Sequence, residues 1–154
     1  MVGTLSSLKA KSKTKLSGKK IGLVVAQWNK DITEALFLGA QNFLLSSGIK
    51  KKNIIRVNVP GSFELPLGAL RLATNKSVDA VICIGCVIKG FTPHFEYICS
   101  AVANGIMSVN LKYKKPIGFG VLTTLNKKQA LERAGGKFGN KGEEAAYSIV
   151  EMLD

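Results

Sequence analysis

Residues 81–94 of the chain read VICIGCVIKGFTPH, and this stretch decides the fold. The first eight residues form a continuous apolar run, which is typical of a β-strand covered on both faces. Gly90 and Pro93 end this strand, and a helical pattern begins near His94. A buried strand that leads through a short turn into a helix predicts an α/β protein with a parallel sheet. In such sheets ligands bind beyond the carboxyl ends of the strands, so the turn before His94 is a candidate site.

The remainder of the chain repeats this alternation of strand and helix. Its short connections predict one four-stranded parallel sheet between two layers of helices, which is a three-layer α/β sandwich. At the start of the first helix, Asp31 and Glu34 have the spacing of a capping box, and Gly48 predicts the end of that helix. The expected strands cover 20–26, 53–59, 78–88 and 117–123, and the expected helices cover 31–48, 65–74, 94–110, 126–134 and 142–153.

The chain is strongly basic, with 22 Lys+Arg against 10 Asp+Glu and a formal net charge of +12 over 154 residues. This length predicts one domain. Six lysines and no acid fall within the first 20 residues, so we expect 1–17 to be a flexible basic arm and 18–154 to be the folded domain. The charge favours anionic partners, although scattered lysines are commonly a solvated surface. No apolar run approaches the ~18 residues of a membrane span and no secretory signal is visible, which predicts a cytoplasmic protein without a membrane partner.

Cys83, Cys86 and Cys99, together with His94, loosely resemble a zinc ligand set. Positions 83 and 86 differ by an odd number within one strand, however, so their side chains point to opposite faces of the sheet. Cys83 also lies too early in the strand for a thioredoxin-type pair, whose first cysteine opens a helix. We therefore interpret the three cysteines as small hydrophobic residues, and we expect neither a metal nor a disulfide framework.

The loops that follow the expected strands meet at one edge of a parallel sheet, and three of them carry unusual residues. Trp28 and Phe63 would form a flat slot for a heteroaromatic ring, with Glu64 at its polar end. His94 can exchange protons near neutral pH, and the turn before it feeds a helix N-terminus that suits a phosphate. Plain alternatives stay open, because aromatic residues at strand ends are commonly core, Glu64 can serve a helix dipole, and a lone histidine is more commonly structural. The residues alone predict an α/β domain that binds a phosphorylated molecule, with an aromatic ring as a further option.

Five blocks of sequence follow one another along the chain, namely VVAQWN (24–29), VPGSFELP (59–66), GCVIKGFTPHFEY (85–97), FGVLTT (119–124) and QALERAGGKFGNKG (129–142). In this order they resemble the motifs of the lumazine synthase family. The second block is similar to the family pattern VPG-[AS]-[FWY]-E-[LI]-P, and the third is similar to G-x-VI-[RK]-G-x-T-x-H-[FY]-[DE]-Y. Because the five blocks follow the family's order over about residues 18–153, the resemblance is far more specific than any one block.

The resemblance implies a flavodoxin-like fold and a homo-oligomer built on pentamers, with each active site between neighbouring subunits. It implies the condensation of 5-amino-6-(D-ribitylamino)uracil with 3,4-dihydroxy-2-butanone 4-phosphate. The products would be 6,7-dimethyl-8-ribityllumazine, phosphate and water, in the penultimate step of riboflavin biosynthesis. No cofactor and no metal are implied, and riboflavin synthase is a candidate protein partner.

The same resemblance implies a role for each matching residue. His94 would be the proton carrier and Trp28 would stack on the pyrimidine, while Arg133 would pair with phosphate through its planar guanidinium. From the residues alone, Arg133 could equally serve a helix dipole and Lys141 could be solvent-exposed. The other implied pyrimidine contacts are Ser62, Phe63, Glu64, Cys86, Val87, Ile88 and Phe119, the other implied phosphate contacts are Phe91, Thr92 and Lys141, and the adjacent subunit would supply Phe119, Arg133 and Lys141.

Four residues depart from the family pattern. Cys86 stands where a hydroxyl or a small residue is common, Phe91 stands where alanine is frequent, and Lys89 replaces a frequent arginine. Phe138 replaces alanine in a link whose bend is associated with sixty-subunit shells. The choice between a free pentamer and a shell therefore stays open.

Two alternatives belong to other functional classes. A non-catalytic lumazine or flavin binder would keep the fold and the aromatic slot, but the presence of His94 and Arg133 argues against it. A nucleic-acid-binding protein is suggested by the net charge. The sequence lacks a recognised binding module and an aromatic platform for single strands, so we expect no nucleic-acid partner.

Overall fold

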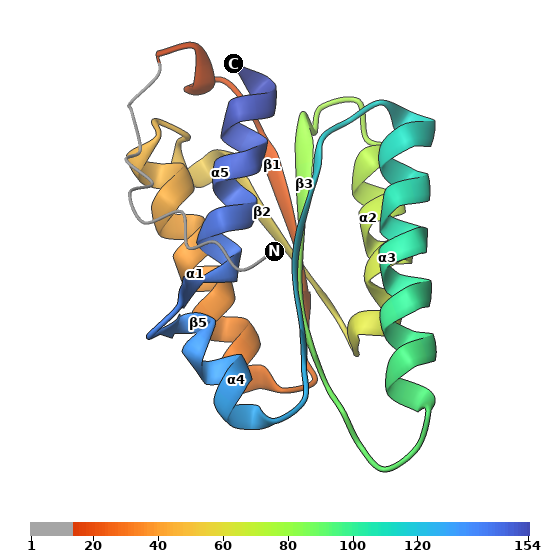
Figure 1. Ribbon diagram of the computed structural model, residues 1–154. Coiled ribbons are helices and arrows are strands. Elements are labelled where there is room, and N and C mark those ends of the chain that lie inside the picture. The colour runs from red at the N-terminus through yellow and green to blue at the C-terminus, as the bar shows by residue number, and fades with distance from the viewer. Residues whose placement is uncertain (1–13) are drawn as a thin grey trace.

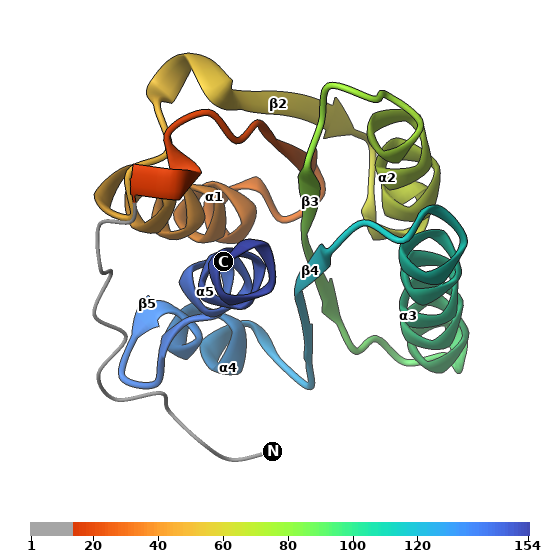
Figure 2. The same ribbon diagram turned by 90° about the horizontal axis from the view of Figure 1, so that it is seen from above.

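The computed structural model describes residues 14–154, which form a four-stranded parallel sheet between two layers of helices (Figures 1 and 2). The strand order is β2-β1-β3-β4, and a short antiparallel hairpin forms a second sheet. This arrangement confirms the predicted three-layer α/β sandwich. The elements are the 3-10 helices η1 (Thr14–Leu16), η2 (Lys51–Asn53) and η3 (Ser62–Glu64), the strands β1 (Ile21–Ala26), β2 (Ile54–Val59), β3 (Ala80–Ile88), β4 (Ile117–Thr124), β5 (Ala134–Gly136) and β6 (Gly139–Asn140), and the helices α1 (Lys30–Ser46), α2 (Leu65–Ala73), α3 (His94–Tyr113), α4 (Lys127–Glu132) and α5 (Lys141–Leu153).

Strand β3 is covered on both faces, as its apolar run predicts. Ile82 and Cys86 belong to the core that the sheet forms with α1 and α5, whereas Val81 and Cys83 belong to the core formed with α2 and α3. Figure 2 shows α1, α4 and α5 on one side of the sheet and α2 and α3 on the other. The prediction that Cys83 and Cys86 point to opposite faces is therefore confirmed.

The strands of the sheet begin at nearly the same level. Ile21 of β1 pairs with Ile54 of β2 and with Ala80 of β3, and Val81 pairs with Ile117 of β4. Because all four strands are parallel, the segments that enter them lie together along one edge of the sheet, which we call the amino edge. The segments that leave them lie along the opposite edge, which we call the carboxyl edge (Figure 1).

The prediction of a capping box at the start of α1 is wrong. The helix begins after Asn29, which adopts a left-handed conformation (φ 58°, ψ 49°) and makes no side-chain cap. Asp31 instead pairs with Lys127 of α4, with 2.8 Å between Oδ2 and Nζ. Glu34 accepts two hydrogen bonds from the guanidinium of Arg56 on β2, which lowers the pKa of its carboxyl group. A bidentate charge-assisted pair stabilises a carboxylate more than a single cap bond would, so the tertiary contact prevails.

Other predicted boundaries hold within a few residues. Gly48 follows α1 with a φ of 100°, which confirms the predicted helix end. The third helix is three residues longer than expected and runs to Tyr113, where Lys114 closes it in a left-handed conformation (φ 50°). No helix among residues 14–154 is long and apolar enough to cross a membrane.

The last residues of the predicted arm are part of the described structure. Leu16 is fully buried in the core between the sheet and α1. The Asn53 side chain donates a hydrogen bond to the Ser17 carbonyl oxygen over 3.2 Å, which ties this segment to the residue before β2. The remainder of the arm, 1–13, lies outside the described residues, so its flexibility stays a prediction.

The crossing of α1 and α5 depends on a close backbone approach. The Asn140 Oδ1 atom accepts hydrogen bonds from the amides of Gly142 (2.9 Å) and Glu143 (3.1 Å), and its Nδ2 donates to the Ala35 carbonyl oxygen of α1 (2.9 Å). Gly142 itself lies against the Leu36 carbonyl group, where a Cβ atom would overlap backbone oxygen. A glycine is therefore required at the second residue of α5.

We predict that Gly142→Ala lowers the free energy of unfolding, by about 1–3 kcal/mol, because the new methyl group displaces α5 from α1. In an open helix the same change would stabilise the chain by up to about 1 kcal/mol, so the sign of the effect is diagnostic. The measurement is urea unfolding followed by circular dichroism. Gly18→Ala is the matched control, because a Cβ at Gly18 meets nothing within 4 Å. Equal stability of the two variants would contradict the close crossing.

Candidate functional site

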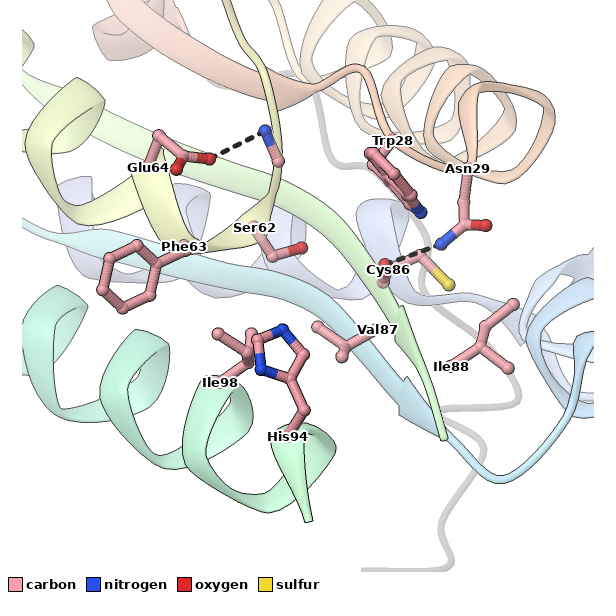
Figure 3. Close-up of a pocket in the computed structure, with 11 residues that line it drawn as sticks. Trp28, Asn29, Ser62, Phe63, Glu64, Cys86, Val87, Ile88, His94 and Ile98 are labelled. Carbon is pink, nitrogen blue, oxygen red and sulfur yellow. Dashed lines mark hydrogen bonds between the residues drawn. The ribbon is translucent and has the colours of Figure 1, made fainter. Parts of the chain in front are cut away.

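A pocket of about 350 Å³ lies at the carboxyl edge, and Figure 3 shows the residues around it. Its walls are the turn between β1 and α1, the 3-10 helix η3, the end of β3 and the first turns of α3. This volume lies in the usual range for small-molecule sites. The lining residues are Trp28, Asn29, Gly61, Ser62, Phe63, Glu64, Cys86, Val87, Ile88, His94 and Ile98.

Trp28 stands at the rim of the pocket on a turn whose backbone is held by β2. The Gln27 amide donates to the Val59 carbonyl oxygen (2.9 Å), and the Trp28 amide donates to the Pro60 carbonyl oxygen (3.0 Å). The indole is nevertheless 74% exposed. A large apolar ring held in water by a fixed backbone is suited to stack on a flat ligand.

Asn29 joins this turn to the central strand. Its left-handed backbone is one that asparagine tolerates better than most residues. Its Nδ2 atom donates a hydrogen bond to the Cys86 carbonyl oxygen over 3.0 Å, as the dashed line in Figure 3 marks. One residue therefore sets both the direction of the chain beyond Trp28 and the distance from that turn to β3.

The wall formed by η3 contains one polar side chain that has a hydrogen-bond partner and one that has none among the described residues. Glu64 accepts a hydrogen bond at Oε2 from the Gly61 amide (2.9 Å), so part of its carboxylate stabilises its own loop. The Ser62 Oγ atom is buried and has no hydrogen-bond partner among residues 14–154. Gly85 of β3 permits this close approach, since a Cβ there would lie 2.6 Å from that hydroxyl. A buried hydroxyl without a partner carries a desolvation cost that a polar ligand atom can remove.

His94 is the first residue of α3, and its imidazole points into the pocket beside Val87 and Ile98 (Figure 3). The turn that precedes it is anchored at one end, where the Lys89 amide donates to the Thr124 carbonyl oxygen of β4 (2.9 Å). Beyond that point, Phe91 and Thr92 are exposed, and within residues 14–154 their amides donate no hydrogen bond. The turn therefore presents free N–H groups next to the histidine.

Charged and sulfur groups around the turn have shifted proton affinities. The Lys89 ammonium donates to Glu96 Oε1 (2.7 Å) and lowers the pKa of that carboxyl group. Burial raises the pKa of the Cys86 thiol to about 12, with a further contribution from Asp31. At neutral pH Cys86 is therefore a protonated thiol, which makes it a weak hydrogen-bonding group and not a nucleophile.

A second charged cluster lies away from this pocket, around the β5–β6 hairpin. Arg133 ends α4, donates to the Phe138 carbonyl oxygen and pairs with Glu144 of α5 over 3.0 Å. Lys141 pairs with the same carboxylate over 3.1 Å. The Glu144 side chain is only 13% exposed, so both cations are held in place by one largely buried anion.

The residues predicted for the site thus fall into separate groups. Eight of them line the one pocket, and Phe91 and Thr92 lie in the adjoining turn. Phe119 on β4, Arg133 and Lys141 do not line it. The eight are Trp28, Ser62, Phe63, Glu64, Cys86, Val87, Ile88 and His94.

Sequence reasoning missed three lining residues: Asn29, Gly61 and Ile98. Ile98 could have been found, because it lies one helical turn after His94 and so faces the same way. The role of Asn29 had no signal in the sequence, since it depends on the distance to β3. Residues 14–154 contain no group of three or more His, Cys, Asp or Glu that could hold a metal ion.

An α/β sandwich with an aromatic-rimmed pocket at the carboxyl edge of its sheet defines a small-molecule-binding protein of the doubly covered parallel-sheet class. Residues 18–154 match the family model of 6,7-dimethyl-8-ribityllumazine synthase. The chain therefore belongs to the lumazine synthase family.

Relatives in several bacteria bear that enzyme's name. The chain is 62% identical to the enzyme of Cytophaga hutchinsonii over 138 residues, which cover 90% of this chain and 87% of the relative. It is 54% identical to that of Parabacteroides distasonis (90% and 86% covered). It is 47% identical to that of Lactiplantibacillus plantarum (90% and 87% covered).

We predict that Asn29→Ala loosens the turn that bears Trp28. The change removes the bond to Cys86 and places alanine in a left-handed conformation, so it should cost about 1–2 kcal/mol of stability for the backbone and about 1 kcal/mol for the bond. The chain contains one tryptophan, so its fluorescence anisotropy decay reports this turn alone. We expect a faster local decay in Asn29→Ala. Asn29→Gly, which tolerates the left-handed backbone, should recover the backbone part of the lost stability but not the slow decay. An unaltered decay in both variants would remove Asn29 from this role.

Proposed function

We propose that this chain condenses 5-amino-6-(D-ribitylamino)uracil with 3,4-dihydroxy-2-butanone 4-phosphate to give 6,7-dimethyl-8-ribityllumazine, phosphate and water. Membership of the lumazine synthase family supports this reaction. The observation that carries it is the pocket, where an exposed indole, a buried unpaired hydroxyl and a histidine meet beside a turn with free amides.

The pyrimidine would occupy the side of the pocket between the β1–α1 turn and η3. Trp28 would stack on the ring, and the Ser62 hydroxyl would find its missing hydrogen-bond partner on the substrate. Phe63 would cover the ribityl chain, and Glu64 would accept from its hydroxyls with the oxygen that does not bind Gly61. The backbone of Cys86, Val87 and Ile88, at the end of β3, would align the ring edge.

The phosphate of the second substrate would lie in the turn before α3. The amides of Phe91 and Thr92 are free, and the positive end of a 20-residue helix follows directly. The bulky Phe91 is compatible with this role because its side chain is fully exposed and leaves the backbone accessible. His94 then lies between the phosphate turn and the pyrimidine.

The reaction needs orientation and proton transfer more than reactive protein groups. The 5-amino group attacks the ketone, and water leaves to form an imine. Elimination of phosphate then gives an enol, which tautomerises to a second ketone. Attack of the 6-amino nitrogen on this ketone, with loss of a second water, closes the second ring. His94 would carry protons between these steps, while the walls hold the two substrates in contact.

Residues of a neighbouring subunit would complete the site. Three residues expected at the site lie outside the pocket of their own chain, namely Phe119, Arg133 and Lys141. Glu144 holds Arg133 and Lys141 in place through ion pairs. The surface around them favours assembly, because β4 is an edge strand and large apolar side chains are exposed nearby. Examples on β4, α3 and the segment next to α4 are Phe119, Tyr97, Met107, Leu111 and Leu125.

We infer a homopentamer, in keeping with the family expectation. A cytoplasmic location and riboflavin synthase as a protein partner belong to the same expectation. A non-catalytic lumazine binder would share the pocket, so turnover and not binding is the property that tests the proposal.

We predict that the protein accelerates lumazine formation over the spontaneous reaction, and that His94→Ala lowers the rate by about 10²-fold, the low end for acid–base catalysis. Pyrimidine affinity should change little. Trp28→Ala is the matched variant, which should weaken pyrimidine binding by about 1–3 kcal/mol while its saturated rate falls less. Lumazine absorbance and phosphate release give the rates. The absence of acceleration by the wild type would reject the reaction, and an unchanged rate in His94→Ala would remove the histidine from it.

We predict that mixing His94→Ala subunits with Arg133→Ala subunits, under conditions that allow exchange, restores activity above that of either variant. Mixed rings contain some interfaces with both residues intact if Arg133 serves the neighbour's site. The double variant Arg133→Ala/Glu144→Gln controls for the buried carboxylate, which the single change leaves with Lys141 as its one remaining cation. Native mass measurement should give a multiple of five subunits, and a fully active monomer would defeat the shared site.

A further inference from the structure

The charged residues of the described chain are divided unequally between the two edges of the sheet. Each segment that enters a strand carries lysine, and nearly all of these lysines are exposed or half-exposed. Figure 1 shows these segments gathered at the upper end of the molecule, whereas the segments that leave the strands lie at the lower end. The residues that line the pocket belong to the carboxyl edge. The amino-edge lysines are Lys15, Lys19, Lys20, Lys50, Lys51, Lys52, Lys76, Lys112, Lys114 and Lys115.

The register of the sheet is what brings these lysines together. The first residues of β1, β2 and β3 are direct partners, and β4 begins one residue further along β3. Lys20, Lys52 and Lys115 therefore lie within two residues of the aligned strand starts. Four strands spaced by about 4.8 Å spread these segments over roughly 15 Å, and the helices on both faces widen the surface further.

Few acids offset this charge. The Asp79 carboxylate accepts hydrogen bonds from Lys19 Nζ (3.2 Å) and from the Lys20 amide (2.8 Å). It is therefore already paired with groups of the amino edge. Glu151 and Asp154, at the end of α5, are the other acids at this end of the molecule, and both have interactions of their own. Among the described residues, Lys19 is the one amino-edge lysine that forms an ion pair.

The carboxyl edge is almost balanced by comparison. Its cations are largely matched by acids. Ion pairs are formed by four of them: Lys89, Lys127, Arg133 and Lys141. Its cations are Lys30, Lys89, Lys127, Lys128, Arg133, Lys137 and Lys141, and its acids are Asp31, Glu64, Glu96, Glu132, Glu143 and Glu144.

From this asymmetry we propose that the amino edge is a binding surface for the phosphate backbone of nucleic acid, separate from the pocket. Arg71, in the last turn of α2, is also exposed at this edge, but the other cations are lysines. Lysines act as point charges toward phosphate and carry no planar fork for base edges. Exposed aromatic rings such as Trp28, Phe63 and Phe91 lie at the other edge, and Tyr113 at the amino edge is half-buried beside Lys112. The contact is therefore sequence-independent and driven by counterion release.

Other polyanions fit this surface less well. Peripheral membrane binding combines basic residues with apolar side chains on one helix face, whereas the amino edge consists of turns on a rigid sheet. An acidic peptide would have to match the spread of the four segments, while a duplex presents phosphates along its whole length. The expectation of no nucleic-acid partner rested on the lack of a base-reading module and an aromatic platform, and a backbone contact needs neither.

The experiment measures binding of the full-length protein to a labelled 20-base-pair DNA duplex by fluorescence anisotropy at increasing KCl concentrations. The amino-edge variant is Lys51→Gln/Lys52→Gln/Lys76→Gln. The matched control is Lys30→Gln/Lys128→Gln/Lys137→Gln, which removes the same charge from the carboxyl edge. We expect wild-type affinity to fall steeply with salt, and the amino-edge variant to bind roughly tenfold more weakly or worse at 50 mM salt with a shallower salt slope. The control should retain most of the affinity.

The outcomes separate the alternatives. Equal losses in the two variants would show that net charge alone attracts DNA, and the absence of binding at low salt would overturn the proposal outright. Tighter binding to anionic phosphatidylserine vesicles or to polyglutamate than to the duplex would assign the surface to another partner class. Lumazine formation by the amino-edge variant should equal that of the wild type, so a failure of this proposal leaves the proposed reaction untouched.

Discussion

The in-register pairing of four parallel strands is the constraint on which the rest of the molecule depends. Strand β3 is hydrogen-bonded to β1 on one side and β4 on the other, and helices cover both of its faces. Its alternate side chains serve two separate cores, so a slip of one residue would move each set into the wrong core. The same pairing fixes where every connecting segment lies, which is why the pocket and the lysine-rich surface occupy opposite edges.

The elements of the fold could be predicted from local patterns, whereas the contacts between them could not. The apolar run of β3 and the glycine and proline that follow it are short-range signals, and they located the start of α3 at His94. Glu34 had the correct spacing for a cap, but its partner is Arg56, which is distant in the chain and near only once β1 and β2 pair. A local pattern competes with such tertiary contacts, and the stronger interaction determines which partner the side chain takes.

The residues of the candidate site show the same difference between features that local signals predict and contacts that depend on tertiary structure. Trp28 and His94 could be predicted because each stands where a strand ends, and parallel strand ends meet. The hydrogen bond from Asn29 to Cys86 depends on a distance that no spacing encodes. The fixed pair of Arg133 and Lys141 around Glu144 explains how cations outside the pocket can still be preorganised, since their carboxylate is largely buried before any ligand is present.

The position where α5 ends has a practical consequence for protein engineering. Leu16 anchors the chain at the amino edge, and α5 ends at the same end of the molecule (Figure 1). A tag, fluorophore or fused domain attached after α5 would begin on the side remote from the pocket. The carboxyl terminus is therefore suitable for displaying cargo without crowding the entrance for substrate.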